Sequence, residues 1–250
     1  MNQPVRAVAE CAPRGCLVYA QDYPGAFARA PLLAEALAKL PADAAAWSRW
    51  AGAPYPQPGD CVTVVQRVFR ENVPVEDADT ELLFNSERAQ MKPDEYRLLK
   101  ALVLRSAQDV QRLYDSIPEK NAALLPPRAT FYGEAPRTAR EMLAHIDIVS
   151  ADYPGKIGAK ALCAADLANN RAAALSAIEA VPRYFFGGVV TDSAGEPWSL
   201  RKVLRRFLWH DRIHARAMFR RAAARWGAGA IADPFGFLAA SPPHLDMERN

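Results

Sequence analysis

The stretch WSLRKVLRRFLWHDRIHARAMFRRAAARWG, residues 198–227, carries the longest helical pattern of the chain. Ser199 is a favourable N-cap residue, and Gly227 is a typical residue after a last helical turn. Between them, apolar residues recur at spacings of three and four, which predicts a helix over 200–226 with one buried face. Continuing that apolar stripe reaches His210 and His214. Both histidines are therefore expected on the face that packs inward.

A third histidine, His145, lies in a second predicted helix over 138–153. Thr138-Ala-Arg-Glu141 has the form of a capping box, which marks the start of a helix. The inner stripe of this helix comprises Met142, Val149 and Tyr153, and His145 falls on it. A buried imidazole needs a hydrogen bond or a metal ion, because an unpartnered polar group in a core is costly.

Two interpretations of these histidines stay open from the residues alone. In the first, His145, His210 and His214 share one metal ion and leave coordination positions for water or substrate. In the second, each imidazole is a hydrogen-bonded core residue. The motif His210-Asp-Arg-Ile-His214 differs from the HExxH motif of metalloproteases, because Asp211 replaces the glutamate that acts as general base. Tyr153 and Asp211 are candidates to orient the imidazoles, Asp211 being expected to face away, and no catalytic residue is assigned.

Two further helices are predicted, over 95–117 and 167–181, after which Pro182 follows directly. Together with the helices at 138–153 and 200–226 they indicate an all-α four-helix bundle. The first part of the chain has a different character. Short β-compatible runs at 5–11, 16–20, 26–30 and 61–69 surround an Ala- and Leu-rich helical pattern at 32–50. We therefore expect an α+β domain over 1–85, a bundle over 86–230 and an irregular tail over 231–250.

Charge and composition support this division and limit the partners. Residues 1–85 carry 7 Lys and Arg against 10 Asp and Glu, a net of −3, whereas residues 86–250 carry 24 against 18, a net of +6. The nine basic residues of the last helix could bind phosphate or RNA, but the aromatic–basic interleaving of an RNA-binding sheet is not present in the sequence. A solvated face with ion pairs to acids elsewhere is the favoured interpretation, so nucleic acid is not an expected partner.

The cysteines and the apolar runs bear on the environment of the protein. Cys11, Cys16, Cys61 and Cys163 form no CxxC pair and are expected to be reduced thiols. The N-terminus has no apolar targeting segment, and no run approaches the ~20 apolar residues of a membrane span. These features predict a cytoplasmic protein without a membrane partner.

Residues 90–227 resemble the DinB-like superfamily of metal-binding four-helix bundles. The resemblance rests on Thr138-Ala-Arg-Glu-Met-Leu-Ala-His145-Ile and on the segment from Trp198 to His214. It implies a metal triad of His145, His210 and His214, with a divalent ion such as Zn, Ni, Fe or Mn. The family includes thiol-dependent isomerases and transferases, so the resemblance also implies a small-molecule thiol or other small substrate. No thiol-binding motif is recognised in this sequence.

Residues 1–50 are similar to HicB-like domains. The similar stretch runs from Cys16 through Asp22-Tyr-Pro-Gly25 to about Ala38, and Ala26 stands where such domains often have cysteine. This similarity implies an interaction or dimerisation module, and a homodimer is one expected partner state. Two functions follow: a metal-dependent transferase, isomerase or hydrolase of the DinB-like type, or a non-catalytic binding or regulatory protein that acts through its HicB-like domain.

Overall fold

The computed structural model describes residues 3–78, 80–130, 133–163, 165–182 and 188–238. The chain divides into two compact units. One unit comprises Met1–Thr80 together with the segment from Asp233 onward, and the other comprises Glu81–Ala232. Most of the tail predicted over 231–250, including His244, lies outside the described residues. The two units are described separately below.

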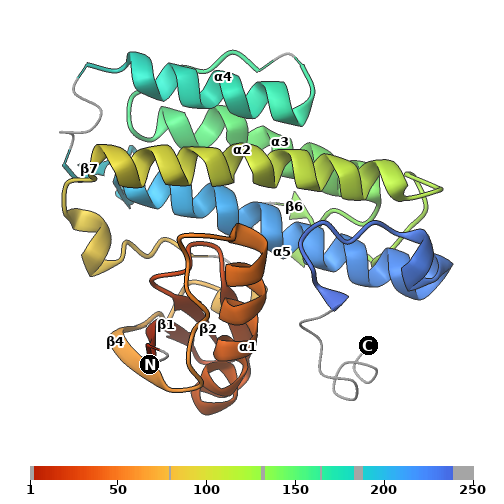
Figure 1. Cartoon of the computed structure of the whole chain (residues 1–250), viewed down its shortest axis with the longest axis horizontal. Coiled ribbons are helices and arrows are strands. Elements are labelled where there is room, and N and C mark those ends of the chain that lie inside the picture. Colours follow the sequence, from red (N-terminus) through yellow and green to blue (C-terminus); the bar gives the residue numbers. More distant parts are fainter. Residues whose placement is uncertain (1–2, 79, 131–132, 164, 183–187, 239–250) are drawn as a thin grey trace. The chain divides into compact units, whose positions relative to one another are not determined.

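The first unit combines one mixed sheet with one long helix (Figure 1). Its elements are β1 (Val5–Ala12), β2 (Gly15–Ala20), β3 (Phe27–Ala30), α1 (Leu33–Ala51) and β4 (Val62–Phe69). The strand order is β3-β2-β1-β4, with antiparallel neighbours except for β1 and β4, which run parallel. The chain passes through α1 between β3 and β4, which allows β4 to return parallel to β1. The four expected strands and the helix are all present.

An aromatic cluster lies in the core of this unit, beside buried alanine, valine and leucine side chains. Trp47 of α1 is fully buried and makes edge-to-face contacts with Tyr23 and Tyr55, with ring centroids 5.9 and 4.6 Å apart. Trp50 contacts the ring of Phe235 at 5.5 Å, which fixes the segment after Asp233 to this unit. Large aromatic side chains bury much apolar surface, so a few of them supply most of a small core.

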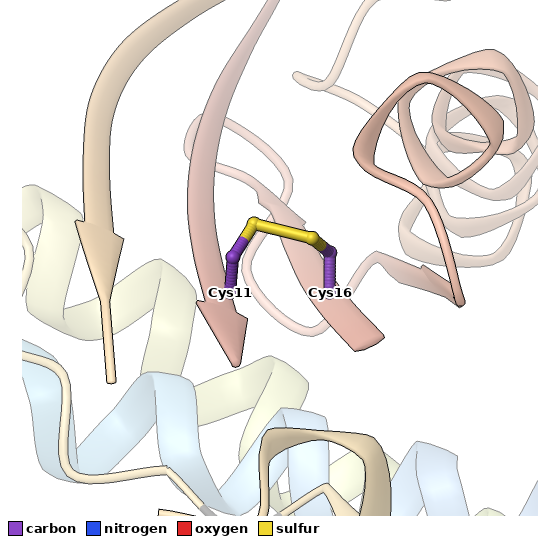
Figure 2. Close-up of a disulfide and its surroundings, with 2 residues drawn as sticks. All are labelled: Cys11 and Cys16. Atoms are coloured by element: carbon purple, nitrogen blue, oxygen red, sulfur yellow. A yellow bond between two sulfur atoms is a disulfide. The ribbon is translucent and has the colours of Figure 1, made fainter. Parts of the chain in front are cut away.

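The expectation of four reduced cysteines is wrong for two of them. Cys11 and Cys16 are joined by a disulfide across the β1–β2 hairpin (Figure 2). They are direct partners in the strand register, and their Cα atoms are 4.1 Å apart. Such a short separation is typical of a non-hydrogen-bonded antiparallel pair, whose side chains approach closely. The spacing of five residues conceals this proximity until the hairpin register is known.

The second unit is mostly helical (Figure 1). Its long helices are α2 (Pro93–Ser116), α3 (Ala139–Gly155), α4 (Leu167–Ala180) and α5 (Leu200–Trp226). The helix α2 packs on α4 and α5, and α3 packs on the same two helices. Two hairpins of two-residue strands interrupt the all-α pattern that the sequence predicted. They are β5 (Ala129–Thr130) with β6 (Gly133–Glu134), and β7 (Val190–Thr191) with β8 (Pro197–Trp198).

The helix ends follow the capping residues closely. The side chains of Thr138, Asp166 and Ser199 each accept a hydrogen bond from the backbone N–H three residues later. The predicted end of this helix at residue 153 is wrong, because α3 continues through Pro154 to Gly155. A proline removes one helical hydrogen bond, and this loss is small at the last turn, where the N–H of Lys156 still bonds to Asp152.

No helix in the described part of the chain has the length and apolar character needed to cross a membrane.

Candidate metal centre

The three predicted histidines meet in the second unit, between α3 and α5. His210 and His214 lie one turn apart on α5, and their ring centroids are 4.5 Å apart. His145 of α3 faces them, with centroid distances of 4.9 Å to His210 and 4.6 Å to His214. The potential ligand atoms of the three residues all lie within 4.8 Å of one another. The structure thus brings together all three residues that the sequence singled out.

The spacing of the nitrogens fits a shared ion. The Nε2 atoms of His145 and His210 are 3.2 Å apart. An ion bound at about 2.0–2.1 Å by two imidazole nitrogens in tetrahedral geometry holds those nitrogens about 3.3 Å apart. A neutral imidazole pair can also form an N–H···N hydrogen bond at this distance. The ring of His214 adjoins both of these rings, as a shared ion requires.

The centre has a buried side and an accessible side. His210 is 6 % exposed, whereas His145 and His214 are each partly exposed. The Nδ1 atom of His210 is buried and has no hydrogen-bond partner among the described residues. The partly exposed rings of His145 and His214 form the side of the centre nearer to solvent.

The surroundings of His145 and His210 favour the neutral form of both imidazoles. Burial lowers the pKa of His210 well below its ordinary value, and the neighbouring His214, His145, Arg206 and Arg171 add to this effect. Burial also lowers the pKa of His145. A neutral imidazole has a free nitrogen lone pair, which is the form that binds a metal. The lowered pKa values of His145 and His210 therefore favour the form of these two side chains that can act as a ligand.

Of the two residues considered for orienting the imidazoles, Asp211 does not perform that role. Its carboxylate accepts two hydrogen bonds from the guanidinium of Arg171, both at 3.0 Å, and both side chains are fully buried. Arg171 of α4 also lies over the ring of Phe207 at 4.1 Å. Asp211 therefore joins α5 to α4, and its side chain faces away from the imidazoles, as expected. Its contribution to the centre is to hold the helix that carries His210 and His214.

Tyr153 does border the centre. Its ring makes an edge-to-face contact with His210, at a centroid distance of 6.1 Å. Its hydroxyl accepts a hydrogen bond of 3.4 Å from Arg206, a residue that sequence reasoning missed as a neighbour of the site. The available signal was the spacing of four between Arg206 and His210, which places both side chains on one face of α5.

Several basic residues of α5 form internal ion pairs. Arg201 binds Glu95, Lys202 binds Glu196 and Arg205 binds Glu87. Lys202 and Arg205 are buried, so this part of α5 is not the solvated face that the sequence suggested. The prediction of ion pairs to acids elsewhere is confirmed for these three residues. Their guanidinium and ammonium groups connect α5 to the first turn of α2, to the segment before α2 and to the segment before α5 itself.

Comparison with known proteins adds no relative. No family model matches the chain, and neither the curated proteins nor the solved structures contain a match. The functional argument therefore depends on the geometry of the three histidines and on the motifs that carry the sequence resemblances.

Proposed function

We propose that the second unit is a DinB-like four-helix bundle that binds one divalent metal ion through His145, His210 and His214 and acts as a metal-dependent enzyme. The observation that carries this proposal is the convergence of three imidazoles from two helices. Three protein ligands leave coordination positions open, as catalytic metal sites require. The imidazole set suits Zn, Ni, Fe or Mn.

The bound ion would supply Lewis acidity, either to hold a small-molecule thiol as its thiolate or to lower the pKa of a bound water for hydrolysis. The chain itself provides position and access. The buried pair of Arg171 and Asp211 holds α5 against α4, and Tyr153 covers the inner side of His210. Thiol-dependent transfer or isomerisation and hydrolysis both remain within this proposal, with a small molecule as substrate.

Metal analysis of untagged protein tests the proposal directly. We expect wild-type protein reconstituted with Zn or Ni to retain close to one equivalent after dialysis, and His210→Ala to lose it. His244→Ala is the matched control, because it removes the one histidine outside the cluster and should leave the metal content unchanged. Equal metal content in wild type and His210→Ala, or no metal in either, would contradict the proposal.

A non-catalytic binding or regulatory role is the second candidate, and one feature of the first unit favours it. The strand β4 forms an edge of the sheet and exposes Val64, Val65 and Phe69. Exposed apolar edge strands are templates for pairing with another chain, including a second copy. Under this proposal the HicB-like domain mediates association and the ion is structural. Chelation followed by circular dichroism separates the two candidates: loss of helix on metal removal supports a structural ion, and an intact fold supports an exchangeable catalytic one.

A further inference from the structure

The end of strand β1 carries the disulfide and also holds the segment that leads to the second unit. This segment, the connector, comprises residues 70–80, all described except residue 79, and Glu81 follows it. The backbone N–H of Arg70 donates a hydrogen bond of 2.7 Å to the carbonyl of Cys11. The sulfur of the same Cys11 is joined to Cys16. One residue therefore binds the neighbouring strand through its side chain and the start of the connector through its backbone.

The other end of the connector is held by the residue that precedes Cys11 in β1. The hydroxyl of Thr80 donates a hydrogen bond to the carboxylate of Glu10, and Nε of Arg70 lies 3.3 Å from the same carboxylate. Glu10 has no solvent exposure, and Thr80 is 3 % exposed. Removing partners from a buried carboxylate is costly, so these contacts hold the connector closely. Both ends of the connector are thus attached to two consecutive residues of β1.

The middle of the connector lies against the two strands that the disulfide joins. Its short 3-10 helix η1 (Val75–Asp77) contacts β1 and β2, and Val75 is fully buried. The disulfide crosses these strands next to their hairpin turn, whose residues Pro13 and Arg14 are exposed. Strand ends of this kind open locally more readily than the core of a sheet. A crosslink at this position therefore limits opening where the connector is attached.

We propose that the Cys11–Cys16 disulfide is a redox switch that fastens the connector in the oxidised protein and releases it in the reduced protein. The reaction is thiol–disulfide exchange with a small thiol, through a mixed disulfide. Two molecules of the thiol give two protons and two electrons to the cysteine sulfurs and become joined as one small disulfide, while the Cys11–Cys16 bond breaks. A small disulfide reverses the reaction with the same balance. The inference goes beyond the proposed function and does not depend on a metal ion.

Reduction removes the crosslink but none of the hydrogen bonds of the connector, so it acts on how often the strand end opens. A disulfide that closes a loop this short disfavours the open state by a factor on the order of 10- to 30-fold. Each opening moves the carbonyl of Cys11 and the carboxylate of Glu10, which hold Arg70 and Thr80. A disulfide with a structural role alone would change the stability of the first unit as a whole and leave the connector no more mobile than α1.

Hydrogen–deuterium exchange measured by mass spectrometry on the full-length protein tests this release. Oxidised protein and protein treated with dithiothreitol are labelled for times that are short compared with global unfolding, so that local opening dominates the exchange. We expect exchange in peptides covering 70–80 to rise about 10- to 30-fold on reduction, with a similar rise over 10–16. Peptides over α1 should not change. Reoxidation with glutathione disulfide should restore the slow exchange.

Two variants complete the test. Cys61→Ala removes an exposed free thiol and should keep the full response to dithiothreitol. Cys11→Ala with Cys16→Ala should exchange fast over 70–80 with or without the reductant. Exchange over 70–80 that is unaffected by reduction, or that rises no more than exchange over α1, would overturn the switch. Two free thiols at Cys11 and Cys16 after treatment with glutathione disulfide would overturn it as well.

Discussion

Arg171→Met tests whether one buried ion pair holds the helix that carries two of the three histidines. The substitution keeps a long apolar side chain over Phe207 but leaves the carboxylate of Asp211, which has no solvent exposure, without its cation. Removing one partner of a buried pair typically costs about 3–5 kcal/mol of unfolding free energy, because the remaining charge is uncompensated. We expect a loss in that range, together with lower metal affinity from a displaced α5.

Urea unfolding followed by circular dichroism at 222 nm measures the loss. The double variant Arg171→Met with Asp211→Leu should recover most of it, since replacing a buried pair by apolar residues is often nearly neutral. Arg97→Met is the matched control, because Arg97 pairs with Asp94 where both side chains are mostly exposed, and such pairs contribute about 0–1 kcal/mol. A loss no larger in Arg171→Met than in Arg97→Met would refute the reasoning.

Two further predictions concern pH and redox state. Burial lowers the pKa of Lys202 from 10.5 to about 8, so between these values the unfolded chain binds a proton that the folded chain has released, and stability should rise with pH. The unfolding free energy of wild type relative to that of Lys202→Met should therefore increase by up to about 3 kcal/mol from pH 8 to 10.5. Urea titrations at several pH values measure this difference. A difference that stays constant with pH would contradict a lowered pKa of Lys202. Reduction of the Cys11–Cys16 disulfide, or Cys11→Ala with Cys16→Ala, should destabilise the first unit by about 2 kcal/mol, as the short loop predicts. Thermal melts with and without dithiothreitol measure this, and the double variant should show no response to the reductant.

Local signals explain which parts of the structure the sequence could predict. The bounds of α5 match the prediction because Ser199 and Gly227 cap it and no proline interrupts it. The grouping of His145, His210 and His214 followed from helical periodicity, which fixes which residues share a face. The ion pair of Arg171 with Asp211 was not predictable, because 40 residues separate the partners and the pair depends on how α4 is rotated against α5. The disulfide was not predictable either, because it depends on the register of β1 and β2, which the β-compatible runs at 5–11 and 16–20 do not specify by themselves.

The buried charges of α5 and the three-histidine centre are parts of one structural argument. Apolar helix packing tolerates small rotations and shifts, because many side-chain arrangements have similar energies. A rotation of α5 by one residue, about 100°, would take His210 away from His145. Two buried ion pairs, Arg171–Asp211 and Arg205–Glu87, oppose such a rotation. The rotation would separate the partners of each pair and leave buried charges uncompensated. These ion pairs select the rotation of α5 at which the three imidazoles converge. Burying the four charged groups costs free energy of desolvation, and we interpret the retention of the pairs as a consequence of the site that this rotation of α5 creates.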